Sequence, residues 1–136
     1  MSTAPTNISS IGSEPQVTVT GTNLVRYTCR FYLWKPVGQT WPETGTRDKL
    51  IRDVTFNMAH APTDTFSLGP APGLKDLALT WDIDMIVPGG GGPLQYSVSV
   101  RIMQDGNDAM SPFWTRQGQI TNVEVASDDT ELRVSS

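Results

Sequence analysis

The residues whose type and spacing best suit acid–base chemistry are Asp82 and Asp84. Two positions apart on an extended strand, their side chains leave the same face about 7 Å from each other. Inverting glycoside hydrolysis uses two carboxyl groups at that separation, one as general acid and one as general base. The pair is equally typical of a solvated sheet face, on which the carboxylates neutralise Arg101 of the strand that follows. The surface interpretation is favoured, so a glycoside hydrolase is the least favoured function.

Two further side chains are reactive in principle but lack a supporting context. His60 is expected to be a loop histidine, because nucleophilic catalysis needs a nucleophile and an orienting acid beside it. Cys29 falls on the apolar face of a predicted strand and is expected to be a small core residue. With one Cys and one His in the chain, neither an intramolecular disulfide nor a Cys/His zinc site can be assembled. We therefore predict no catalytic residue, metal site or cofactor, and no enzyme.

Two loops offer backbone amides or oxygen ligands. The four glycines at 89–92 lack the Lys-Ser/Thr ending of a phosphate-binding loop and join two predicted strands, so they are expected to form a hairpin loop. Residues 105–108 place Asp105, Asn107 and Asp108 at the short spacing of a calcium loop, but without its twelve-residue pattern and terminal Glu. A plain turn is favoured there, with calcium binding as the alternative.

The tryptophans carry the strongest indication of a binding site. Trp34 falls on the polar face of its predicted strand, Trp41 lies in a long loop beside Pro42, and Trp114 stands near the start of another strand. An exposed tryptophan usually packs over other groups, either of the protein itself or of a ligand. Trp41 is therefore expected either to fold back over the core or to form a stacking platform for a sugar ring or another flat apolar face.

Period-two alternation identifies the elements that must position these residues. Three long strands are predicted at 25–34, 76–87 and 94–103. Their apolar faces consist of Val25, Tyr27, Cys29, Phe31 and Leu33 in the first, Leu77, Leu79, Trp81, Ile83, Met85 and Val87 in the second, and Leu94, Tyr96, Val98, Val100 and Ile102 in the third. Weaker strands are predicted at 15–20, 50–58, 64–68, 113–117, 119–126 and 131–135.

No window has a sustained period of 3.6, and the connections are rich in Gly and Pro. The sequence therefore predicts an all-β fold: a tail at 1–14 and a single antiparallel β-sandwich domain over 15–136, jelly-roll-like or immunoglobulin-like in broad architecture, with about seven to nine strands and little helix. The strands at 76–87 and 94–103 are expected to pair as a hairpin. A register slip would bury Asp82 and Asp84, so Ile83 should oppose an even-numbered residue such as Val98.

The composition limits the classes of protein to which the chain can belong. Its 136 residues match one domain, and 10 Lys and Arg against 14 Asp and Glu give a net charge of -4, the wrong sign for binding nucleic acid. No apolar run approaches the roughly 20 residues that span a bilayer. Residues 1–14 lack the basic and apolar regions of a signal peptide and are expected to be a flexible polar tail. The sequence thus predicts a soluble protein, cytoplasmic or released without a conventional leader.

If each strand crosses the sandwich, successive connections alternate between its ends. The connections 35–48, 69–75 and 104–112 then share one end, and 59–63 and 88–93 share the other. The first end gathers the predicted ligand-binding residues, which are Trp34, Trp41, Asp105, Asn107, Asp108 and Trp114. Aromatic faces combined with a few convergent polar groups are typical of sites for sugars and other polar ligands.

Three classes of function follow. A non-catalytic, lectin-like binding module that holds a carbohydrate or a similar small polar ligand in these loops is favoured. The alternative is an assembly protein that pairs with its own copies or with a protein partner, through strand edges and the face carrying Arg26, Arg30, Tyr32 and Trp34. The enzyme that would use Asp82 and Asp84 comes last.

Overall fold

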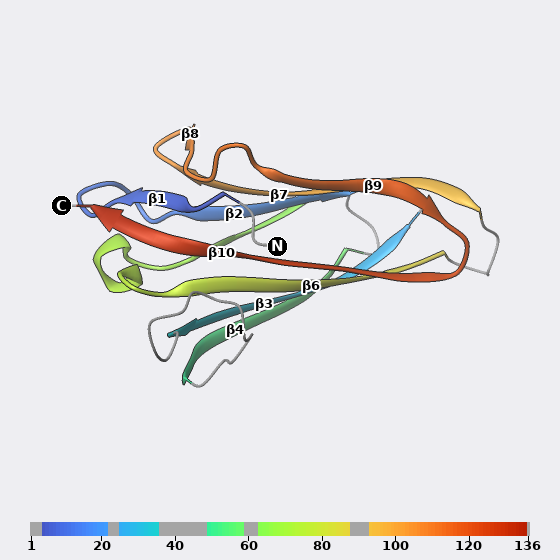
Figure 1. Ribbon diagram of the computed structural model, residues 1–136, viewed down its shortest axis with the longest axis horizontal. Coiled ribbons are helices and arrows are strands. Elements are labelled where there is room, and N and C mark those ends of the chain that lie inside the picture. The colour runs from blue at the N-terminus through green and yellow to red at the C-terminus, as the bar shows by residue number, and fades with distance from the viewer. Residues whose placement is uncertain (1–3, 22–24, 36–48, 59–62, 88–92, 136) are drawn as a thin grey trace.

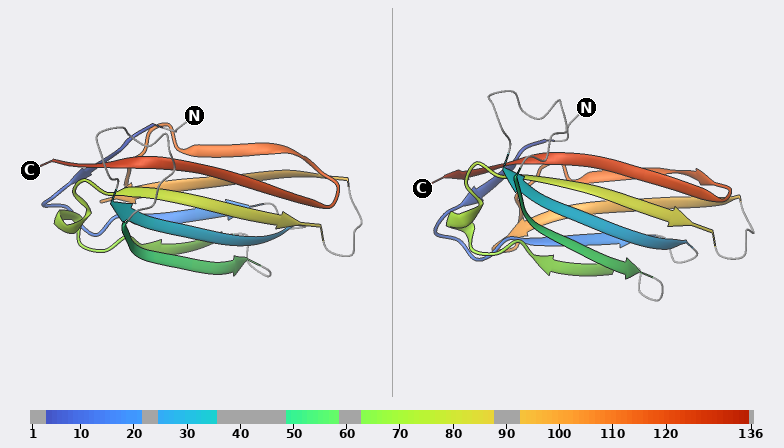
Figure 2. Two further views of the ribbon diagram at one scale, coloured as in Figure 1. Left: turned by 60° about the horizontal axis from the view of Figure 1, so that its bottom comes forward. Right: turned by 90° about the horizontal axis from the view of Figure 1, so that it is seen from below.

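The computed structural model describes residues 4–21, 25–35, 49–58, 63–87 and 93–135, and of 49–58 we describe the backbone only. The regular structure in these residues is almost entirely β-strand, and two sheets pack against each other as a sandwich (Figures 1 and 2). The helical structure in them is a single 3-10 turn, η1 (Ala71–Leu74). The prediction of an all-β sandwich with little helix is confirmed.

The two sheets are named after their central strands. The β6 sheet has the order β1 (Thr6–Ser9), β10 (Val123–Ser135), β6 (Ala78–Ile86), β3 (Arg26–Lys35) and β4 (Lys49–Met58). The β7 sheet has the order β5 (Thr63–Ser67), β2 (Gln16–Gly21), β7 (Leu94–Gln104) and β8 (Asn107–Asp108), and β9 (Trp114–Ile120) also pairs with β7. Strand pairs are antiparallel except β1 with β10, which run parallel.

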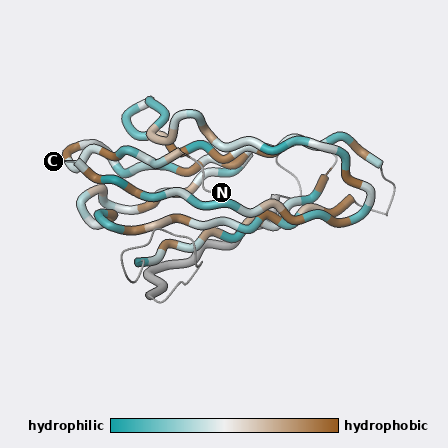
Figure 3. Tube along the Cα trace, in the orientation of Figure 1, coloured by the Kyte–Doolittle hydropathy of each residue, from teal (hydrophilic) through white to brown (hydrophobic). Residues whose placement is uncertain are grey.

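The core lies between the sheets and is built by the predicted alternation. Figure 3 shows hydrophobic and hydrophilic residues alternating along the long strands. All the residues predicted for the apolar faces of the three long strands are buried except Leu94, which is partly buried against the same cluster. Aromatic rings link the sheets: Phe66 lies 5.0 Å from Phe31, Phe31 lies 6.0 Å from Trp81, and Trp81 lies 5.6 Å from Trp114, between ring centroids.

The predicted hairpin between residues 76–87 and 94–103 is wrong. β6 pairs with β3 and β10, whereas β7 pairs with β2, β8 and β9, so the two strands belong to opposite sheets. Ile83 opposes Cys29 and Ala126 instead of Val98. The apolar faces of β6 and β7 can be buried equally well whether the two strands face each other across the core or lie side by side in one sheet. Alternation alone therefore does not distinguish the two arrangements.

Both ends of the chain also differ from expectation. The strands predicted at 119–126 and 131–135 are parts of β9 and of one long strand, β10. Thr6–Ser9 of the predicted tail form β1, which pairs with Leu132–Ser135 of β10 and adds Ile8 to the core. Thr6 is buried as well, and its hydroxyl lies 2.8 Å from that of Thr130. A polar composition suggested a tail, but strand pairing and one buried isoleucine are enough to order these residues.

Candidate functional site

Two of the three connections that the strand count assigned to one end of the sandwich, 69–75 and 104–112, lie at the same end. Residues 63–67 form a full strand, and η1 and the β7-β8 turn lie at the same end of the molecule (Figure 1). The end of β3 lies there too, because Trp34 pairs with Ala78 at the start of β6. Residues 36–48, with Trp41, residues 59–62, with His60, and residues 88–92, with the four glycines, lie outside the described residues.

Asp105 and Gly106 form the tight turn between β7 and β8. Both have positive φ angles, 53° for Asp105 and 81° for Gly106, and Gln104 pairs with Asn107 across the turn. An Asp-Gly pair suits this two-residue hairpin geometry, because Asp tolerates the left-handed region and Gly has no Cβ to clash there. Residues 105–108 are therefore a hairpin turn, as favoured from the sequence, and the described residues contain no cluster of three or more His, Cys, Asp or Glu that could hold a metal ion.

Asp108 is held by Arg101 on the outer side of the β7 sheet. The Nε and Nη2 atoms of Arg101 donate to the two carboxylate oxygens of Asp108 over 3.1 and 2.9 Å. The hydrogen bonds and charge of Asp108 raise the pKa of Arg101 above its usual value. The guanidinium carbon lies 4.7 Å from the centre of the Phe113 ring, which is 39% exposed. The Asp108 carboxylate, a predicted ligand-binding group, is thus held in a planar pair with the Arg101 guanidinium rather than in a free loop.

The side-chain amide of Gln104 holds the N-terminal segment at the end of β7 through hydrogen bonds. Its Nε2 donates to the carbonyl oxygens of Ser9 and Ser13 over 2.8 and 2.9 Å, and its Oε1 accepts from the Ser9 amide over 2.8 Å. Gly12 leaves room for this contact, because a Cβ at that position would lie 2.5 Å from Gln104 Nε2. The Ser13 amide donates to Asp105 Oδ1 over 3.3 Å. This one buried amide therefore joins β1 to the β7-β8 hairpin.

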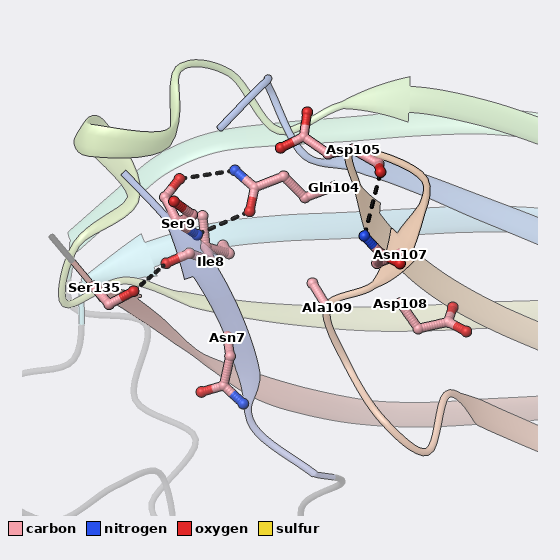
Figure 4. A pocket seen from close by; sticks show the side chains of 9 residues that line it. All are labelled: Asn7, Ile8, Ser9, Gln104, Asp105, Asn107, Asp108, Ala109 and Ser135. Atoms are coloured by element: carbon pink, nitrogen blue, oxygen red, sulfur yellow. Dashed lines mark hydrogen bonds between the residues drawn. The ribbon is translucent and has the colours of Figure 1, made fainter. Parts of the chain in front are cut away.

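A hollow of about 330 Å³ lies between β1, the end of β10 and the β7-β8 hairpin. Figure 4 shows Gln104 bridging to Ser9 on one side of it, while the Asp108 carboxylate points away from β1. It is lined by Asn7, Ile8, Ser9, Gln104, Asp105, Asn107, Asp108, Ala109 and Ser135. Three of the six predicted ligand-binding residues therefore share one hollow, of a size at the lower end of the usual range for small-molecule sites.

The described tryptophans do not join this hollow. Trp34 lies on the outer side of the β6 sheet, as its strand parity predicted, but only 2% of it is exposed and its Nε1 donates to Thr80. Trp114 is 8% exposed and packs against Trp81 in the core. The expectation that Trp34 and Trp114 offer open rings beside the polar loops is therefore wrong. Strand parity assigns a side of the sheet, but it does not say what covers that side.

The reactive side chains singled out in the sequence lie elsewhere. Asp84 accepts a hydrogen bond from Arg30 over 3.2 Å, and Asp82 accepts one from Ser127 over 2.8 Å, both on the outer side of the β6 sheet. The arginine that neutralises Asp84 is thus Arg30, and Arg101 as the expected partner was wrong. Cys29 is fully buried as predicted; burial, with smaller effects of two nearby aspartates, raises the pKa of its thiol to about 12 and keeps it protonated near neutral pH.

No local pattern predicts Asn7, Ser9 and Ser135 in the hollow, because parallel pairing of the two chain ends brings them there. Gln104 was also missed, although it had a detectable pattern. It continues the even-numbered apolar series of β7 with a buried polar residue. A polar side chain in that position must find hydrogen-bond partners, which is the mark of a structural or binding role.

Comparison of the chain with known protein families, curated proteins and solved structures finds no match. Among the described residues, no helix has the length and apolarity needed to cross a membrane. Function is therefore inferred from the residues and geometry of the site alone.

Proposed function

We propose that the protein is a non-catalytic, lectin-like module that binds a carbohydrate or a similar polar ligand at the β7-β8 end of the sandwich. The observation that carries this proposal is the polar hollow, which is lined by Asp105 and Asn107 of the β7-β8 hairpin and by Asn7 of β1. Carboxylate and amide groups on a rigid frame are the groups that fix hydroxyl-rich ligands, because they accept and donate hydrogen bonds in set directions. Trp41 stays a predicted ligand-binding residue.

The experiment is a screen on a glycan array, followed by calorimetric titration of any sugar retained. We expect Asn107→Ala to weaken binding about tenfold, the equivalent of losing one good contact. Thr28→Ala, on the outer side of the β6 sheet, is the control and should bind like the parent. Retention of no glycan, or equal binding by Asn107→Ala and the parent, would contradict the proposal.

The alternative, an assembly role, is favoured by one specific observation. Ile86, Val123 and Val125 are 46%, 59% and 50% exposed. Val123 pairs directly with Ile86, and Val125 follows on the same outer side of the β6 sheet. Contiguous exposed apolar side chains can mark a contact with another chain.

Sedimentation velocity tests this alternative. If the apolar cluster joins copies of the chain, Val125→Asp should dissociate them. Ile11→Asp, at a residue that is 91% exposed and outside the cluster, should leave the sedimentation coefficient unchanged. A parent protein that stays monomeric at all concentrations tested would contradict the assembly function.

A further inference from the structure

The outer side of the β7 sheet has an unusual chemical composition. The outward-facing positions of β5, β2, β7 and β9 all carry a hydroxyl or a carboxamide except Arg101 and Met103. They are Thr63, Thr65 and Ser67, then Gln16, Thr18 and Thr20, then Gln95, Ser97, Ser99, Arg101 and Met103, then Thr115, Gln117 and Gln119. All of these positions are exposed or half-exposed. We call this surface the hydroxyl face.

The strand register arranges these side chains in rows. Thr63, Thr20, Ser99 and Thr115 form one row across four strands, and Thr65, Thr18 and Arg101 form the next. Thr18 and Thr65 have hydroxyls 3.1 Å apart, and those of Thr63 and Thr20 are 3.5 Å apart. Neighbouring strands lie about 4.8 Å apart and successive rows about 7 Å apart, so the hydroxyls form a regular array on the sheet.

The charge of the hydroxyl face is low. Arg101 is its charged position on the strands, and Asp108 neutralises it. Glu14, just before β2, reaches one corner, where its carboxylate accepts a hydrogen bond from Ser67 over 2.6 Å. The outer side of the β6 sheet differs sharply, since it presents Arg30 and Asp84 along with Arg26 and Asp82. A polar, uncharged partner therefore suits the hydroxyl face better than a charged one.

An aromatic ring stands beside the array. Phe113 precedes Trp114, whose ring points into the core, and it lies under the guanidinium of Arg101 on the outer side. It therefore stands next to the row that contains Thr18 and Thr65. A partly exposed aromatic ring, a planar Arg-Asp pair and neighbouring hydroxyls are together suited to the apolar faces and hydroxyl groups of sugar rings.

We propose that the hydroxyl face binds a neutral polysaccharide chain laid along the β7 sheet, beginning at Phe113 and the Arg101–Asp108 pair. Asp108 borders both this face and the hollow. The inference therefore rests on the proposed function, and it specifies the carbohydrate ligand as a polymer. An open sheet surface makes few contacts with one sugar unit. Binding therefore has to accumulate over successive units of a chain.

A second copy of the protein fits the hydroxyl face less well. Cores of protein–protein interfaces are rich in aromatic and aliphatic side chains and poor in serine. On the hydroxyl face the larger apolar groups, Phe113 and Met103, lie toward one end. In a dimer, the remaining rows would bury hydroxyls and amides against the hydroxyls and amides of the second copy. A polyhydroxylated chain instead offers each of these groups a matching donor or acceptor.

The test uses the full chain and neutral glucan, xylan and amylose, each as oligosaccharides of increasing length and as the polymer. Affinity electrophoresis and calorimetry measure binding, and the thermal midpoint checks folding. We expect affinity to rise with chain length. Phe113→Ala should weaken binding of the polymer about tenfold, and the double variant Thr18→Val with Thr65→Val should weaken it severalfold. Thr28→Val, the same change on the other sheet, should have no effect.

Three results would overturn the inference. If affinity does not depend on chain length and is lost in Asn107→Ala but not in Phe113→Ala, the hollow is the site and the hydroxyl face is not. If none of the three neutral sugars binds at any chain length, the inference fails, while the proposed function of the hollow still stands or falls on the glycan array and Asn107→Ala. If light scattering shows copies associating and Phe113→Ala separates them, the face is a protein interface.

Discussion

At the scale of single residues, burial decides what each side chain can do. Trp81 is fully buried and contacts rings from both sheets, and its Nε1 has no hydrogen-bond partner among the described residues. Cys29 sits in the same core with a thiol that burial keeps protonated. Both are therefore structural residues, and their effects should appear in the stability of the fold.

Truncation of the central aromatic residues should be severely destabilising. We expect Trp81→Ala and Phe31→Ala each to lower the free energy of unfolding by about 3–5 kcal/mol, because each leaves a large cavity in the core. Trp81→Phe should cost less, since it keeps a ring and removes an indole N–H that lacks a partner. Urea denaturation measures all three, and an unchanged midpoint for Trp81→Ala would refute its place in the core.

Cys29 should make the fold less stable in alkaline solution. Its pKa rises from 9.0 to about 12 on folding, so above pH 9.0 the unfolded chain releases a proton that the folded chain keeps. Stability is therefore complete below that pH and is lost as the pH rises toward about 12, by about 1.4 kcal/mol per pH unit at most. Denaturation at several alkaline pH values should show a shallower loss for Cys29→Ala than for the parent, and identical slopes would be the opposite result.

At the scale of elements, the most informative strand is β1. It is four residues long and pairs in parallel with the end of β10. The Asn7 amide also donates to the Ala109 carbonyl over 2.8 Å, so β1 contacts segments that belong to both sheets. So short a strand draws much of its stability from side-chain contacts, of which the Gln104 amide makes two with Ser9, and a third hydrogen bond of the same amide holds Ser13 just beyond the strand.

Gln104→Met should therefore loosen β1 while keeping the side-chain volume. The change leaves the Ser9 amide and two carbonyls without their partner, which should cost about 1–3 kcal/mol. Hydrogen exchange should accelerate at residues 6–10 and remain unchanged in β3 and β6. Gln95→Met, at an exposed position of the same strand, is the control. Uniformly faster exchange throughout the sandwich would show that Gln104 supports the whole fold rather than β1.

At the scale of the whole molecule, the two outer surfaces differ in charge and their special features lie far apart. Charged pairs such as Arg30–Asp84 cover the β6 sheet, whereas the hydroxyl face covers the β7 sheet. The exposed apolar cluster begins at Val123 and the hollow includes Ser135, twelve residues further along the same strand, or about 40 Å. Binding at one place should thus leave the other unaffected.

Binding of a neutral polysaccharide should accordingly be insensitive to salt. The Arg101–Asp108 pair is already neutralised, so no counterions are released when an uncharged chain binds. We expect less than about a twofold change in affinity between low and high ionic strength, measured by calorimetry. A steep fall in affinity with salt would instead indicate a charged ligand and would contradict a neutral polymer.

The sequence alone determined which residues face the core. The pleat of a strand repeats every two residues, so the burial of Cys29, Trp81 and Val98 follows from local alternation, and the Asp105-Gly106 turn follows from backbone preferences. These are properties of short segments, and distant parts of the chain do not change them.

Only the tertiary structure decided how the strands are combined. Alternation is the same whether β6 and β7 lie side by side or face each other, and long-range packing placed them in opposite sheets. The same long-range packing paired β1 with β10, buried Trp34 on an outer side, and gathered Asn7, Gln104 and Asp105 around one hollow. The candidate site was thus predictable in its Asp105–Asp108 turn, but its other walls come from residues that no local pattern joins.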